Sequence, residues 1–148
     1  MVTYKTGDVV EALKNKEFDV LVHGCNCFCT MGAGVAHQIK TAYPEVWEID
    51  KMTKRGDETK LGTYSSIGVE DGRTIVNAYT QFDYHRTETP NVRYKAIIDV
   101  LEKVRDDFPD KKIGMPKIGC GLAGGDWEIV GWIVENVFKD REVIVYEL

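Results

Sequence analysis

The sequence predicts an α/β fold with three layers, α/β/α, in which helices cover both faces of a mixed central sheet. Short apolar segments rich in β-branched residues, typical of buried strands, alternate with longer segments whose apolar residues recur at helical spacing. The region 62–80 adds two β-rich runs around Asp71-Gly72, a dipeptide that favours the tight turn of a hairpin. At 148 residues the chain fits a single domain, 1–148.

The individual elements follow from these patterns. Strands are predicted where apolar runs are short and nearly continuous: Phe18–His23, Lys112–Pro116 and Glu142–Tyr146. Helices are predicted where apolar residues face one side and charges the other: Val35–Tyr43, Tyr94–Phe108 and Trp127–Phe138. The alternation predicts parallel strands, and the hairpin adds an antiparallel portion.

Composition limits the function classes. The net charge of −5 argues against broad binding to nucleic acid, because a chain without a basic stripe displaces few counterions from phosphates. No apolar run approaches the roughly 20 residues of a bilayer span, and Met1–Val10 has no signal-peptide core. We therefore expect a cytoplasmic protein that does not bind membranes, in which backbone amides hold any anionic ligand.

Four cysteines, Cys25, Cys27, Cys29 and Cys120, are expected to be reduced thiols. Structural zinc usually uses C-x₂₋₄-C pairs, whereas three of these cysteines alternate along the chain, so no metal and no cofactor are predicted. A nucleophilic cysteine would need an activating partner and partial exposure.

Two glycine-rich segments each lead from a predicted strand into a helix. The first is 23–36 and the second is 117–127. Their glycines let backbone N–H groups approach a ligand, and a helix N-terminus adds partial positive charge. Either segment alone can be a tight turn, but two at the carboxyl ends of neighbouring strands favour one shared phosphate-binding crevice. Neither matches a nucleotide P-loop or a G-x-G-x-x-G fingerprint.

At these residues the sequence resembles the macrodomain family. The similar motifs are Thr6-Gly7-Asp8-Val9-Val10, His23-Gly24-Cys25-Asn26-Cys27 with Met31 to Ala36, Ile118 to Leu122 with Trp127, and the ending Ile144 to Leu148. The resemblance implies an ADP-ribose site with adenine at Asp8 and Val9. It further implies contacts of the ribose and diphosphate with Asn26, Gly32, Ala33, Gly34, Val35, Phe82, Ile118, Gly119, Cys120, Gly121, Leu122, Ala123 and Gly124.

Within the family, the sequence is similar to ADP-ribose 1''-phosphate phosphatases and to terminal ADP-ribose protein glycohydrolases. The phosphatases share the histidine, cysteine and asparagine of segment 23–27, together with Met115-Pro116 and Trp127. The glycohydrolases share segments 31–34 and 118–122 and use a lysine and an aspartate. This sequence departs from them, because Gln81 and Ala123 stand at those two positions. The resemblance therefore favours the phosphatase branch.

Two residues are candidates for acid/base chemistry. His23 has a suitable reference pKa near 6.5, and Asp126 ends the second glycine-rich segment. Each has a structural alternative: His23 as a hydrogen-bonded histidine of a buried strand, and Asp126 as the N-cap of the last helix.

Two function classes remain open. One is a hydrolase that removes a group from ADP-ribose, first of all phosphate and next an acyl or protein link. The other is a module that binds ADP-ribose, or an ADP-ribosylated protein, without turnover. Both use the same loop residues, so only the acid/base groups distinguish them.

Overall fold

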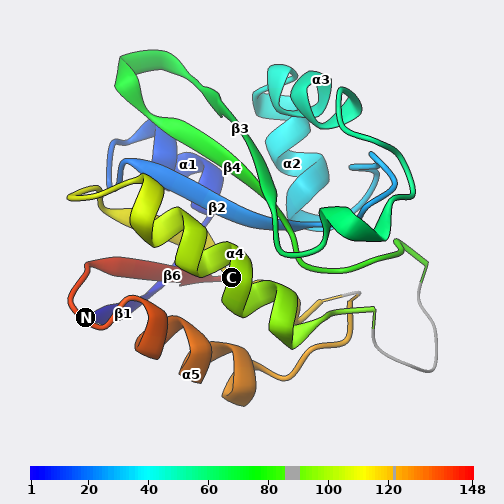
Figure 1. Cartoon of the computed structure of the whole chain (residues 1–148). Helices are drawn as coiled ribbons and strands as arrows, with labels where there is room; N and C mark the ends of the chain where they lie inside the picture. The colour runs from blue at the N-terminus through cyan, green and yellow to red at the C-terminus, as the bar shows by residue number, and fades with distance from the viewer. Residues whose placement is uncertain (86–90, 122) are drawn as a thin grey trace.

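A six-stranded mixed sheet forms the centre of the protein in the computed structural model, which describes residues 1–85, 91–121 and 123–148 (Figure 1). The order across the sheet is β1-β6-β5-β2-β4-β3, and all neighbouring strands run parallel except β3 and β4. The strands are β1 (Val2–Thr6), β2 (Val20–Cys25), β3 (Tyr64–Gly68), β4 (Thr74–Tyr79), β5 (Ile113–Pro116) and β6 (Val143–Glu147). The predicted mixed sheet is confirmed.

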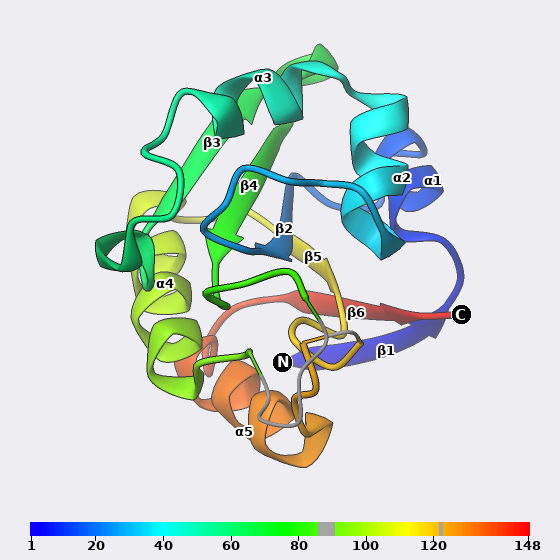
Figure 2. The same cartoon turned by 90° about the vertical axis from the view of Figure 1, so that its right-hand side faces the viewer.

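Helices cover both faces of this sheet (Figure 2). On one face lie α1 (Val9–Lys14), α2 (Gly34–Ala42) and α3 (Glu45–Lys51), and on the other lie α4 (Tyr94–Asp107) and α5 (Trp127–Val137). Successive residues of a strand point to opposite faces, so β2 contributes to two cores. Val20 and Val22 pack in the core under α4 and α5, whereas Leu21 packs in the core under α1 to α3. The predicted three layers are confirmed.

The predicted hairpin is formed by β3 and β4, which pair antiparallel from Tyr64↔Ala78 to Gly68↔Thr74. Asp71 and Gly72 both adopt positive φ, 60° and 73°, which is the backbone conformation expected of residues in a tight hairpin turn. The connection is longer than a two-residue turn, because a short 3₁₀ helix, Glu70–Gly72, lies within it.

Among the strands and α-helices of the described residues, three were not predicted from the sequence: β1, α1 and α3. β1 is an edge strand whose residues from Thr3 to Thr6 are exposed, so it lacks the apolar run of a buried strand. α1 and α3 span 6 and 7 residues, fewer than the two to three turns over which a helical period becomes visible.

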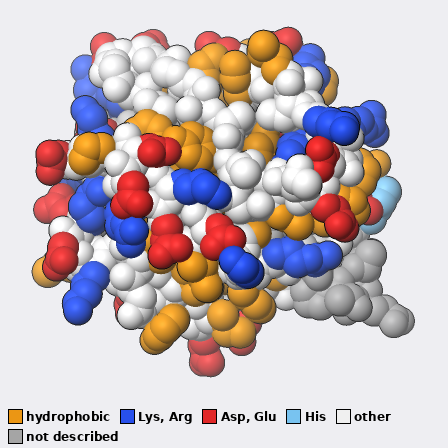
Figure 3. Space-filling model, viewed as in Figure 1, with side chains coloured by type: hydrophobic (Ala, Val, Ile, Leu, Met, Phe, Trp, Pro, Cys, Tyr) orange, Lys and Arg blue, Asp and Glu red, His pale blue; other side chains and the backbone are white. Residues whose placement is uncertain are grey.

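The surface in Figure 3 carries charges of both signs, with Lys and Arg interspersed among Asp and Glu over α4. On this helix Lys95 pairs with Asp99 at 3.0 Å, and Arg105 pairs with Asp106 at 2.9 Å. This face therefore bears a mixed charge pattern instead of a basic stripe. Among the described residues, none of the helices has the length and apolar character needed to cross a membrane.

Candidate functional site

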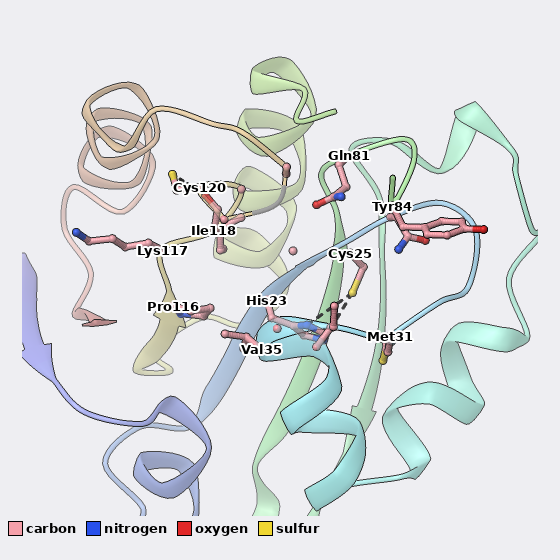
Figure 4. Close-up of a pocket in the computed structure, with 18 of the residues that line it drawn as sticks. His23, Cys25, Met31, Val35, Gln81, Tyr84, Pro116, Lys117, Ile118 and Cys120 are labelled. Carbon is pink, nitrogen blue, oxygen red and sulfur yellow. Dashed lines mark hydrogen bonds between the residues drawn. The ribbon is translucent and has the colours of Figure 1, made fainter. Parts of the chain in front are cut away.

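A cavity of about 910 Å³ opens at the carboxyl ends of the parallel strands β2, β5 and β6 (Figure 4). His23 to Asn26 at the end of β2 form its floor, and Pro116 and Tyr146 come from the ends of β5 and β6. The position is the one at which open α/β sheets usually bind ligands. Its size lies within the range of small-molecule sites, about 300–1,000 Å³.

The first glycine-rich loop forms one wall of the cavity and leads into α2. Gly32, Ala33, Gly34 and Val35 all line the cavity, and α2 begins at Gly34. Its N-cap residue, Ala33, makes no side-chain capping bond, so the first N–H groups of α2 have no partner within the helix. An uncapped helix N-terminus facing a cavity suits a phosphate group.

Asn26 organises this loop through its own side chain. Its Oδ1 accepts a hydrogen bond from the backbone N–H of Phe28 at 2.8 Å, and its Nδ2 donates to Thr30 Oγ1 at 2.8 Å. The residue is 8% exposed and lines the cavity with Thr30. Its Nδ2 also donates to Thr30 O at 3.2 Å, so the amide nitrogen is engaged within the loop and the remaining lone pair of Oδ1 is left for a ligand.

The second glycine-rich loop forms the opposite wall. Ile118, Gly119, Cys120, Gly121 and Ala123 line the cavity, Gly124 lies outside its lining, and Leu122 falls outside the described residues. Glycine is required at position 119, because φ is +75° and a Cβ there would lie 2.8 Å from Val92 Cγ2. By contrast, a Cβ on Gly121 would meet no heavy atom within 4 Å.

His23 lines the cavity but is buried, with 1% of its surface exposed. Its Nε2 lies 2.6 Å from Asn77 Oδ1 on β4, and Cys25 Sγ lies 3.7 Å from its Nδ1. Burial lowers the pKa of His23 to about 4, although the hydrogen bond to Asn77 opposes this effect. The imidazole is therefore neutral at physiological pH and is poorly suited to donate a proton.

Asp126 and Asp8 are both helix N-caps. Asp126 accepts a hydrogen bond from Glu128 N at 2.9 Å, is exposed, and does not line the cavity, so the structure gives it the capping role. Asp8 accepts from Val10 N at 2.8 Å. Asp8 and Val9 line a small hollow that shares Val35 and Tyr146 with the main cavity, so they border its far end.

The other side chains at the mouth of the cavity come partly from residues that sequence analysis did not select. Gln81 and Tyr84 line the cavity, whereas Phe82 packs against Phe28 with ring centroids 5.0 Å apart and does not line it. Lys117 lines the cavity and pairs with Glu147 at 3.0 Å. Lys117 directly follows β5 and Glu147 ends β6, and these positions in the sequence were the signals that could have placed both residues at the site.

Cys25, Cys27 and Cys120 differ in position but share a low acidity. Burial raises the pKa of Cys25, of Cys27 to about 11, and of Cys120. Cys25 and Cys120 line the cavity as neutral thiols. Among the described residues, no group of His, Cys, Asp and Glu side chains has an arrangement that could hold a metal ion.

These features define a three-layer α/β domain with a ligand cavity between two glycine-containing loops. The chain belongs to the Macro domain family, whose family model matches residues 22–134.

Three relatives illustrate the range of similar proteins. The chain is 36% identical to the uncharacterized 17.5 kDa protein in the tk-vs intergenic region of Enterobacteria phage T4, over 99% of this chain and 96% of that protein. It is 31% identical to the ADP-ribose glycohydrolase OARD1 of Bos taurus, over 99% and 91%. It is 26% identical to the ADP-ribose 1''-phosphate phosphatase of Saccharomyces cerevisiae, over 99% and 98%.

A solved structure supports the same relationship. The macrodomain of Mycobacterium tuberculosis DarG superimposes with a TM-score of 0.81 at 27% identity, covering 100% of this chain and 98% of that domain.

Proposed function

We propose that this protein binds ADP-ribose in the cavity and hydrolyses a substituent on the distal ribose, with ADP-ribose 1''-phosphate as the leading substrate. One observation carries the proposal: two glycine-containing loops, after β2 and β5, form opposite walls of one cavity of about 910 Å³. Relatives named as ADP-ribose glycohydrolase and ADP-ribose 1''-phosphate phosphatase support the choice of ligand.

The ligand would span the cavity from Asp8 to Asn26. The diphosphate would lie between the uncapped N-terminus of α2 and the loop 118–121, where backbone N–H groups supply the donors. Adenine would lie by the hollow that Asp8 and Val9 line. The distal ribose would then reach Asn26, whose amide oxygen has a lone pair left to accept from a hydroxyl group.

Phosphate is the leading group to be removed because the site lacks the ionisable pair expected for a lysine-dependent glycohydrolase. Gln81 and Ala123 both line the cavity, and neither side chain titrates. The Gln81 amide also donates to Asp83 O at 2.9 Å. Loop amides would stabilise the charge on the phosphoryl oxygens, as preorganised donors do in other hydrolases.

Of the two predicted acid/base groups, we retain His23, since Asp126 does not line the cavity. With a pKa of about 4, His23 would act as a neutral hydrogen-bond acceptor for a hydroxyl group or water, and not as a general acid.

A second candidate is hydrolysis of an acyl or protein link to ADP-ribose. This candidate is supported by sequence identity, which is 31% to the bovine glycohydrolase and 26% to the yeast phosphatase. Binding without turnover is the third outcome, because the only imidazole at the described cavity is 1% exposed.

The decisive experiment follows release of inorganic phosphate from ADP-ribose 1''-phosphate, alongside calorimetric binding of ADP-ribose. We expect slow release by the wild type and a rate roughly 10²–10⁴-fold lower for His23→Ala, with product binding retained. His37→Ala, at an exposed position on α2, is the matched control. A His23→Ala rate within about threefold of wild type removes His23 from the mechanism. Binding without phosphate release rejects the phosphatase and directs the assay to acyl- and protein-linked ADP-ribose.

A further inference from the structure

A continuous chain of buried and partly buried hydrogen bonds connects His23 at the cavity floor to a carboxyl group on α3. His23 Nε2 lies 2.6 Å from Asn77 Oδ1, and Asn77 Nδ2 lies 3.1 Å from Ser65 Oγ. Ser65 Oγ lies 2.8 Å from the Tyr79 hydroxyl, which donates to Asp50 Oδ1 at 2.7 Å. The chain therefore crosses from β2 through β4 and β3 to α3.

The donor and acceptor of each hydrogen bond in this chain follow from Asp50, the residue at its end. A carboxylate only accepts, so the Tyr79 hydroxyl donates to Asp50, and its oxygen then accepts the hydroxyl hydrogen of Ser65. Ser65 Oγ is thereby left to accept from the Asn77 amide nitrogen. Every donor in the chain points from His23 towards Asp50.

Asp50 is fully buried, and its Oδ2 has no hydrogen-bond partner among the described residues. Burial raises the pKa of Asp50, while the hydrogen bond from Tyr79 and the charge of Lys60 oppose the rise. Lys60 Nζ lies 4.6 Å from the centre of the Tyr79 ring and donates to Cys27 O at 3.1 Å. A donor and a nearby cation thus offset part of the cost of burying this carboxyl group.

A second acceptor fixes the orientation of the Asn77 amide independently. Its Nδ2 also donates to the backbone carbonyl of Val46 at 3.1 Å, and a carbonyl oxygen cannot donate. Both amide hydrogens of Asn77 are therefore used, by Val46 O and by Ser65 Oγ. The amide oxygen must face His23, and it can only accept the proton on Nε2.

We infer that Asn77 is a positioning residue that holds the proton of the neutral His23 imidazole on Nε2 and leaves Nδ1 as a hydrogen-bond acceptor beside Cys25. Cys25 Sγ lies 3.7 Å from Nδ1 and also 3.7 Å from Nε2, and both residues line the cavity (Figure 4); with the proton held on Nε2, only Nδ1 has a lone pair that can accept from the thiol. A neutral thiol can donate to Nδ1, and a ligand hydroxyl that displaces the thiol would use the same lone pair. Any effect of Asn77 on turnover rests on the proposed role of His23. The position of the proton on the imidazole is independent of that role.

The proton position is measured directly by long-range ¹H–¹⁵N correlation spectra of the His23 ring, recorded across pH in the full chain. Wild type should show protonated Nε2 and bare Nδ1. In Asn77→Asp, a carboxylate of the same shape accepts from Nε2, so the proton should stay there while the pKa of His23 rises clearly above about 4. In Asn77→Leu, which removes the acceptor, the Nδ1-protonated tautomer should become populated.

Ser66→Ala is the matched control, because Ser66 is the next residue of β3 and a strand turns successive side chains to opposite faces. Its His23 spectrum should equal that of wild type. If Asn77→Leu does not fold, Asn77→Asp still decides the matter. An unchanged His23 pKa in Asn77→Asp, or an unchanged tautomer in a folded Asn77→Leu, overturns the inference. If the wild type releases phosphate, Asn77→Leu should lower kcat with little change in KM. An inactive wild type would refute the proposed turnover and leave the spectroscopic test intact.

Discussion

Replacing Gly121 with valine should abolish most ADP-ribose binding while leaving the fold intact. Gly121 is exposed, lacks a positive φ, and has open space within 4 Å of where a Cβ would be placed. Gly121 also lines the cavity. A branched side chain there would displace the diphosphate from the loop amides. Loss of one hydrogen bond to a charged group corresponds to about 1.5–3 kcal/mol, or roughly a 10- to 100-fold rise in Kd.

Isothermal calorimetry of ADP-ribose with wild type and Gly121→Val gives the measurement, with thermal melting to confirm folding. Gly68→Val is the matched control, since Gly68 also lacks a positive φ, has its nearest potential contact at 4.0 Å, and lies on β3 away from the cavity lining. We expect the control to bind like wild type. A folded Gly121→Val variant with unchanged affinity would refute the placement of the diphosphate.

Three further outcomes follow from the site. Asp8→Ser keeps an N-cap for α1 but removes the carboxylate, so calorimetry should show roughly tenfold weaker ADP-ribose binding with an unchanged Tm. Equal affinity would show that adenine does not bind at Asp8. Glu147→Gln should strengthen ADP-ribose binding about two- to fivefold, because it releases Lys117 from its ion pair. Lys117→Gln should weaken ADP-ribose binding and reduce the salt dependence of that binding. If both variants shift the affinity in the same direction, this role of Lys117 is wrong. Because the pKa of His23 falls from 6.5 to about 4 on folding, the His23 imidazole is protonated in the unfolded chain but neutral in the folded chain between about pH 4 and pH 6.5. Its contribution to stability is therefore complete above pH 6.5 and declines by roughly 3 kcal/mol as pH falls to 4. Urea unfolding of His23→Gln should show a shallower loss over this range than the exposed-site control His37→Gln.

The sequence was sufficient for the parts of the fold that carry a strong local pattern. The apolar runs of β2, β5 and β6 and the amphipathic faces of α4 and α5 produce periodicities visible over single segments. The glycine-rich loops were likewise recognisable, because Gly119 has a backbone conformation and a close neighbour that exclude a side chain. Both kinds of signal come from residues close together in the chain.

The environments of the polar side chains could not be predicted in the same way. His23 and Asn77 meet across 54 positions, and only the pairing of β2 with β4 brings them together. The burial that lowers the pKa of His23 depends on the same packing. Lys117 and Glu147 form their ion pair for the same reason, since β5 and β6 run side by side.

The placement of β6 between β1 and β5 has a consequence for synthesis of the chain. β1 precedes the other strands of the described sheet in sequence, yet its only strand partner there is β6, which follows them all, and the Met1 amine donates to Arg141 O across 140 positions. Pairing of such distant segments is slow, because a long loop must close before the contact is gained. During synthesis, β1 and the edge of β5 that pairs with β6 therefore lack these partners until β6 has been made. Tyr146 and Glu147 line the cavity, so its wall is complete only once β6 has paired.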